Sequence, residues 1–126
     1  MKIKKRDEAP PVETPGYTAV TKQVVLGPED GSDEIVLRYF TVAAGGATPY
    51  HSHDFPHLVK IEAGRGVAVD AHGGESPVIA GDYVYVESNE VHNFNNTGDA
   101  PFEFVCIVPL RGELSGAFCS APPSGE

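Results

Sequence analysis

The sequence has few basic residues, few cysteines and no long apolar run, and each shortage excludes a class of protein. With 9 Lys and Arg against 18 Asp and Glu, the formal net charge is -9, which disfavours nucleic acid or an anionic membrane surface as a partner. Two cysteines in 126 residues do not form a disulfide framework. No apolar run approaches the roughly 20 residues needed to cross a bilayer.

The basic run at residues 2–6 is the only segment that begins like a targeting signal. No apolar segment follows it, so no signal peptide is expected. Residues 1–16 as a whole are charged and rich in proline, which predicts an irregular N-terminal arm. We therefore expect a soluble, cytoplasmic protein that acts on neither nucleic acid nor membranes.

Short β-forming segments separated by turn residues fill the chain from residue 17 onward. The 14 Gly and 11 Pro fit many short strands better than long helices, and no segment longer than one turn has a helical period. The predicted strands are residues 17–26, 34–42, 57–64, 66–70, 76–80, 83–86, 91–95 and 102–108. This pattern predicts a single all-β domain, either a sandwich or a barrel.

Four of the five histidines, His51, His53, His57 and His92, fall in a pattern that suits a metal ion. Alternate residues of a strand face the same side, so His51 and His53 lie roughly 6.6 Å apart and their rings can meet at one ion. A bend at residues 54–56 brings in His57, and His92 is expected to close the site from a distant strand. Imidazole nitrogens suit zinc, copper, iron, nickel or manganese. Four converging rings without an ion would be hard to satisfy, which favours a metal site over a histidine-rich loop.

The spacing of these histidines resembles that of the cupins, whose first motif is G-x5-H-x-H-x(3,4)-E-x6-G and whose second is G-x5-P-x-G-x2-H-x3-N. The residues that match the first motif are Gly45, His51, His53, His57 and Gly64, with His57 where glutamate is usual. The residues at the spacing of the second are Gly81, Glu87, Asn89, His92 and Asn96, with Glu87 and Asn89 replacing proline and glycine. The chain is most similar to the small four-histidine, manganese-type mono-cupins.

This resemblance implies a cupin jelly-roll barrel (a double-stranded β-helix) over residues 17–111, between an arm at 1–16 and a C-terminal tail at 112–126. It also implies a homodimer and one divalent transition metal held by the four histidines. Manganese is the expected metal, with iron, zinc, nickel and copper as alternatives. Because the usual glutamate is absent, the mechanisms of glutamate-containing cupins, oxalate-processing and dioxygenase enzymes among them, do not carry over unchanged. An all-histidine shell leaves a centre of charge about +2, which favours an anionic ligand.

Strand parity and spacing nominate five further residues for the lining of the metal cavity: Arg38, Phe40, Phe94, Phe104 and Cys106. Cys106 is interpreted either as a small buried hydrophobe or as a group near the metal. Arg38 is interpreted either as a rim residue paired with an acid or as an inward group that holds a carboxylate.

Other residues that attract notice receive plainer interpretations. Tyr83 and Tyr85 alternate with valines and are expected to pack on the outer face, where they would suit a dimer interface. His72 lies in a glycine-flanked turn and is expected to be an ordinary surface histidine. Cys119 lies in the tail, where we expect no specific role.

Three functions remain open on the sequence. The favoured one is a metal-dependent oxidoreductase of the dioxygenase type that acts on a small organic molecule, because an apolar pocket would surround open coordination positions. The second is a Lewis-acid isomerase or hydrolase, for which the sequence offers no general base. The third is a non-catalytic module that binds a metal or a small ligand. No Ser-His-Asp arrangement, phosphate-binding glycine loop or CxxC motif is visible.

Overall fold

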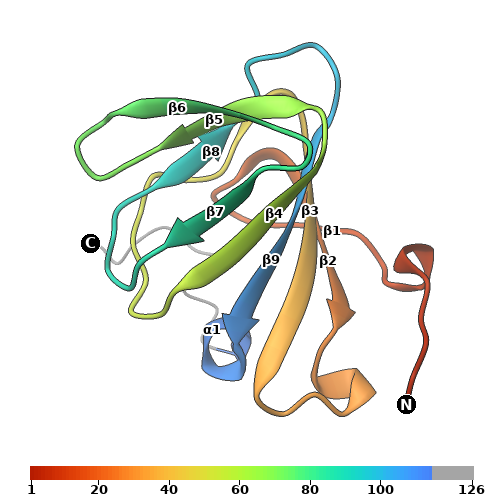
Figure 1. Cartoon of the computed structure of the whole chain (residues 1–126). Helices are drawn as coiled ribbons and strands as arrows, with labels where there is room; N and C mark the ends of the chain where they lie inside the picture. The colour runs from red at the N-terminus through yellow and green to blue at the C-terminus, as the bar shows by residue number, and fades with distance from the viewer. Residues whose placement is uncertain (115–126) are drawn as a thin grey trace.

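The structure is a computed structural model that describes residues 1–114, which form one curled antiparallel sheet and three short helical turns (Figure 1). The strands are β1 (Val12–Glu13), β2 (Thr18–Leu26), β3 (Ile35–Ala47), β4 (His57–Ala63), β5 (Arg65–Val69), β6 (Glu75–Ile79), β7 (Tyr83–Val86), β8 (Asn93–Asn95) and β9 (Phe102–Pro109). The helical turns are η1 (Arg6–Glu8), η2 (Pro28–Asp30) and α1 (Leu110–Leu114). The predicted all-β class is confirmed. Within the described residues, no helix is long and apolar enough to cross a membrane.

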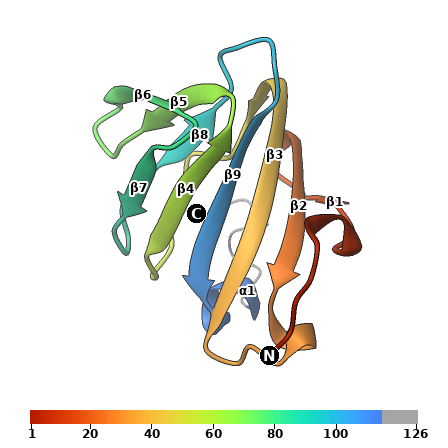
Figure 2. The same cartoon turned by 45° about the vertical axis from the view of Figure 1, so that its right-hand side comes forward.

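The long strand β3 joins the two halves of the sheet. The strand order is β6-β5-β8-β3-β9-β4-β7, and β2 lies on the other side of β3 with β1 at its edge. Most of β3 pairs with β9, whereas its last residue, Ala47, pairs with Asn95 of β8. The sheet therefore curls around its buried face, as the two views in Figures 1 and 2 show.

Alternating burial along β3, β4 and β9 supplies the wall on which the site is built. In β9, Phe102, Phe104, Cys106 and Val108 are all buried, and the residues between them are partly exposed. Across the sheet, Phe40 of β3 lies opposite Phe104, and Val59 of β4 lies opposite Cys106. The predicted inner face of residues 102–108 is therefore confirmed, because a period of two buries every second residue.

Two strands differ from their predicted bounds by more than one residue. The strand predicted at residues 34–42 continues to Ala47, because Ala47 still finds a partner in β8. The strand predicted at residues 91–95 begins only at Asn93, because His92 pairs with a single residue outside any named strand.

The N-terminal arm is held against β2 along part of its length. Val12 and Glu13 pair with Lys22 and Thr21, and the side-chain amide of Gln23 donates hydrogen bonds to the carbonyl oxygens of Arg6 and Ala9. Ala9 is also buried, so the arm packs on the sheet despite its proline-rich composition.

A turn at Gly64 links β4 to β5 and closes one end of the curl. Its φ is +75°, and a Cβ at this position would collide with the carbonyl of Pro101, which leads into β9. Glycine is thus required for both conformation and space, which explains the motif glycine at this position.

Candidate metal centre

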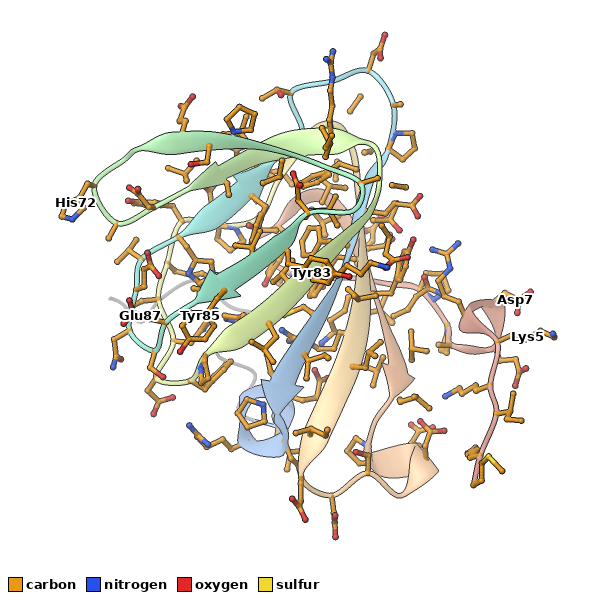
Figure 3. All side chains as sticks on the ribbon, viewed as in Figure 1. Lys5, Asp7, His72, Tyr83, Tyr85 and Glu87 are labelled. Carbon is orange, nitrogen blue, oxygen red and sulfur yellow. The ribbon has the colours of Figure 1, made fainter. Side chains whose placement is uncertain are left out.

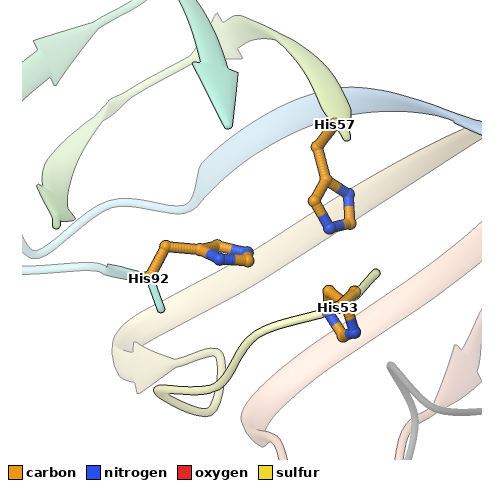
Figure 4. Close-up of side chains that lie close together, drawn as sticks. All are labelled: His53, His57 and His92. Carbon is orange, nitrogen blue, oxygen red and sulfur yellow. The ribbon is translucent and has the colours of Figure 1, made fainter. Parts of the chain in front are cut away.

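Three different parts of the backbone carry the four histidines of the pattern. His57 is the first residue of β4 and faces the buried side with Val59. His51 and His92 form an isolated antiparallel bridge, and His53 follows in the loop that leads to β4. The chain thus brings together the histidine-rich loop, the start of β4 and the residue that precedes β8. Figure 4 shows the rings of His53, His57 and His92 turned toward one another.

The imidazole nitrogens of His53, His57 and His92 lie within 4.8 Å of one another. Nitrogens bound to one ion at about 2.1 Å are at most about 4.2 Å apart, so small ring movements would close this triangle around a cation. His51 lies beside the three, with its ring centroid 4.3 Å from that of His53 and 6.1 Å from that of His92. The structure thus forms a three-histidine metal site, and a fourth ligand from His51 stays a prediction.

The hydrogen bonds made by the metal-site imidazoles leave some of their ring nitrogens free to bind an ion. His92 Nδ1 lies 2.8 Å from the carbonyl oxygen of Glu90, and His57 Nδ1 lies 3.2 Å from Cys106 Sγ. Within residues 1–114, the buried atoms His53 Nδ1 and His57 Nε2 have no hydrogen-bond partner. Unsatisfied buried polar atoms are costly, and a metal would satisfy them. These residues therefore fit a divalent transition metal.

Burial keeps the rings neutral, which is the form that binds a metal. It lowers the pKa of His51 to about 4, with a smaller effect from His92, and the pKa of His53 to about 3. Burial, reinforced by His92 and Arg38, lowers the pKa of His57 to about 2. The pKa of His92 is also lowered by burial, although its bond to the Glu90 carbonyl opposes the effect. At neutral pH all four rings thus carry an available lone pair.

The histidines open onto a cavity of about 30 Å³, and the structure places all five nominated residues in its lining: Arg38, Phe40, Phe94, Phe104 and Cys106. The aromatic rings form one continuous wall, with centroids 5.3 Å apart for Phe40 and Phe104 and 4.9 Å apart for Phe94 and Phe104. A water needs roughly 10–15 Å³ of such space, so the cavity has room for an ion and a small ligand.

Arg38 combines the two interpretations drawn from the sequence. Its side chain faces the cavity and is 1% exposed, yet its Nη1 also lies 3.6 Å from Glu113 in α1. Its Nη2 donates to Cys106 Sγ at 3.2 Å. Burial by itself would lower the pKa of Arg38, but Cys106 and Glu113 outweigh it and raise that pKa above its ordinary value. The cavity wall therefore carries one permanent positive charge next to the histidines.

Sequence reasoning missed Tyr17, Thr48 and Phe55. Tyr17 lines the cavity, stacks on Phe40 and lies edge-on to His51, with ring centroids 6.3 and 6.5 Å away. Thr48 lines it as well, and its hydroxyl accepts a hydrogen bond from the Phe94 backbone at 2.9 Å. No spacing signal marked these two. Phe55 is 1% exposed and stacks on His53 at 5.0 Å, and its place two residues after His53 was a signal available in the sequence.

The remaining notable residues lie away from the site. His72 is exposed in a turn, as predicted (Figure 3). Tyr83 and Tyr85 project from the outer face of β7 and are 77% and 62% exposed. Cys119 falls outside the described residues.

Comparison with known proteins agrees with this geometry. Residues 38–108, which include all four histidines, match the cupin domain. The chain belongs to the cupin family. The curled sheet is accordingly the predicted cupin jelly roll, and the substitution of His57 for the usual motif glutamate is a feature of this cupin.

Similar proteins have varied names. This cupin is 33% identical over 67 residues to an oxalate-binding protein of Thermotoga maritima, a match that covers 52% of this chain and 54% of the relative. It therefore spans about half the length of that curated relative. The polyketide cyclase RemF of Streptomyces resistomycificus is 26% identical, with a TM-score of 0.81 over 87% of this chain and 80% of its own. A cupin-2 domain protein of Rhodospirillum rubrum is 32% identical, with a TM-score of 0.68 over 80% and 66%.

Proposed function

We propose that this cupin holds one divalent transition metal on His51, His53, His57 and His92, and catalyses a dioxygenase-type oxidation of a small anionic molecule. The observation that carries the proposal is the cluster of buried, neutral imidazoles with unsatisfied nitrogens beside an apolar cavity. Manganese is the expected metal, with iron, zinc, nickel and copper as alternatives. When bound, such a metal supplies a positive charge that attracts an oxygen ligand and, for manganese or iron, a redox centre.

The charge around the cavity supports an anionic ligand. The histidines contribute no negative charge that would offset the charge of the metal, and Arg38 adds a positive charge to the cavity wall. An anion in the cavity is therefore attracted by both the metal and Arg38. The name of the Thermotoga maritima relative, oxalate-binding protein, points to the same class of ligand. We therefore propose a small carboxylate or phenolate as the ligand of this cupin.

The side chains around the cavity favour oxidation over proton-transfer chemistry. Among the described residues that line it there is no carboxylate to serve as a general acid or base. Phe40, Phe94 and Phe104 instead exclude water from the ligand. In the proposed reaction both atoms of dioxygen enter the product, and the organic molecule supplies all four electrons, so no further reductant is needed.

The small size of the cavity, about 30 Å³, supports a second candidate function. A cavity of this size suits a non-catalytic module in which the metal retains a small anion and stabilises the jelly roll. Metal loading would then raise the melting temperature and bind the anion without any turnover.

The experiment uses metal-free protein loaded in turn with manganese, iron and zinc, with dioxygen uptake followed against a panel of small carboxylates and phenolates. Uptake that requires manganese or iron, and that is lost in His92→Ala but kept in His72→Ala, supports the oxidoreductase. Equal turnover with zinc and without dioxygen uptake supports a Lewis-acid isomerase or hydrolase. Tight metal and anion binding with no turnover across the panel supports the binding module.

We also propose that two copies of this cupin pair through the outer face of the sheet. The register places five apolar residues opposite one another across five adjacent strands, in the row Tyr85, Leu58, Ile107, Leu37 and Leu26. An outer sheet face that meets water is ordinarily polar. We refer to these five residues as the apolar row.

The area and charge of this face suit a second copy. Tyr83 and Tyr85 are both more than half exposed, and two such rings contribute roughly 200–300 Å² of the ~800 Å² per partner of a standard interface. Lys60 and Glu62, whose charged groups lie 3.1 Å apart, neutralise each other beside the row. Two chains of formal net charge -9 can therefore meet here without direct repulsion.

The cytoplasm is the proposed location of this protein. It is a reducing compartment, which would keep Cys106 a thiol.

A further inference from the structure

Cys106 lies between a buried cation and a metal-site histidine. Its Sγ is 3.2 Å from Arg38 Nη2 and 3.2 Å from His57 Nδ1. The sheet enforces this placement, because Cys106 on β9 lies opposite Arg38 on β3 and opposite Val59 on β4, two residues after His57. Three adjacent strands thus fix all three groups, and Cys106 is 3% exposed.

The chemistry of the two contacts sets the direction of the hydrogen bonds. A guanidinium only donates, so the sulfur is the acceptor in its contact with Arg38. A neutral imidazole carries one N–H and one lone pair, and the partner of one nitrogen decides the role of the other. If the thiol donated to His57 Nδ1, the N–H would lie on Nε2, which is buried and has no partner within residues 1–114. If Nδ1–H donates to the sulfur, the lone pair on Nε2 is free.

We propose that Cys106 is a positioning residue that holds His57 in its Nδ1–H tautomer and leaves Nε2 free for the ion. In this arrangement the sulfur accepts a hydrogen bond from Arg38 Nη2 as well as from His57 Nδ1. Carboxylates, backbone carbonyls and waters are the usual partners of a metal-binding histidine, and here a thiol takes that place. The role in metal binding rests on the proposed function, whereas the tautomer is a property of the metal-free protein.

The test measures the His57 tautomer by two-bond proton–nitrogen correlation in ¹⁵N-labelled, metal-free protein at neutral pH. We expect the Nδ1–H form in the wild type and its loss as the dominant form in Cys106→Ala. Binding of Mn²⁺, measured by calorimetry, should weaken about 10- to 100-fold in the same variant. Val42→Ala is the matched control, because it shortens a buried side chain of β3 that lies opposite Phe102, at the far end of β9 from Cys106, and outside the lining of the cavity. It should keep both the tautomer and the affinity.

Two further variants keep the proposal testable. Cys106→Val retains the side-chain volume without an acceptor and replaces Cys106→Ala if that variant does not fold. Cys106→Ser keeps an acceptor, although its shorter bond to Cβ holds the oxygen farther from His57, and it should recover part of the Nδ1–H population. An Nε2–H tautomer in the wild type, or an unchanged tautomer in Cys106→Ala and Cys106→Val, overturns the inference. Absence of Mn²⁺ binding by the wild type counts against the proposed metal function, and the tautomer measurement still decides the role of Cys106.

Discussion

The backbones of His51 and His92 pair directly. The amide of His51 donates to the carbonyl of His92 at 3.2 Å, and the amide of His92 donates to the carbonyl of His51 at 3.1 Å. This bridge ties the histidine-rich loop to the chain that enters β8. The backbone therefore sets the spacing of the two imidazoles, and the ion would enter a site that is already assembled.

Replacement of His92 by alanine should remove a ligand while the bridge, which uses only backbone atoms, is kept. We expect the affinity for Mn²⁺ to fall by at least roughly 100-fold, equivalent to about 2.8 kcal/mol. Titration of metal-free protein by calorimetry measures the change. His72→Ala, which removes an exposed histidine, should bind as the wild type does. Equal affinity in the two variants would place the ion elsewhere.

The metal site was predictable from the sequence because its information is local. The spacing of two residues between His51 and His53 keeps their rings together even though they lie in a loop and not in a strand, and the spacing around His92 repeats a known motif. The alternation of a strand identified Phe104 and Cys106 as inward residues. Period and spacing are properties of short segments, and they survive folding unchanged.

What the sequence did not predict depends on contacts between distant segments. The ion pair of Arg38 with Glu113 requires α1 to fold back beneath β3 and β9, and no pattern around either residue encodes that return. Tyr17 reaches the cavity because the start of β2 lies next to Phe40. Partners of this kind follow from the curl of the sheet, which pairwise spacing in one sequence does not specify.

The packing of α1 against Phe55 should affect the metal site. A Cβ on Gly112 would lie 2.7 Å from the Phe55 ring, which stacks on His53 with 13° between the planes. We expect Gly112→Ala to displace Phe55 and to lower the free energy of unfolding by about 1–3 kcal/mol. Mn²⁺ affinity should fall as well, because His53 loses its support.

Gly98→Ala is the control for this substitution, since a Cβ there meets its nearest neighbour at an ordinary 3.5 Å. Urea unfolding and calorimetric titration of both variants make the comparison. A Gly112→Ala protein with wild-type affinity would show that Phe55 does not position His53.

The proposed pairing through the apolar row predicts a change in assembly. Leu58 lies in the row between Tyr85 and Ile107 and is 53% exposed, so Leu58→Asp would place a charge where two copies meet. We expect the wild type to sediment as a dimer and the variant as a monomer with its fold intact. Ile79→Asp, at an equally exposed position on the edge strand β6, should leave the dimer unchanged. A monomeric wild type at micromolar concentration would contradict the pairing.

Acid should destabilise the metal-free protein through its buried histidines. The pKa values of His51, His53 and His57 in the folded state are about 4, 3 and 2, against about 6.5 in an unfolded chain. Below pH 6.5 the unfolded chain takes up protons that the folded protein does not, so the stabilising effect of the neutral rings is present above that pH and is lost as the pH falls.

The expected slope between pH 6 and pH 5 is of the order of 1 kcal/mol per ring per pH unit, from 1.4 kcal/mol per pKa unit. Carboxylates titrate mostly below this window, so the histidines dominate it. Urea unfolding of metal-free protein at pH 7, 6 and 5 measures the slope. His57→Ala should reduce the slope by the contribution of one ring, whereas His72→Ala should leave the slope unchanged. A free energy of unfolding that stays constant over this range would mean that the rings already share protons in the folded protein. Protons would then compete with the metal for the rings below about pH 6.5, because a protonated imidazole has no lone pair to give.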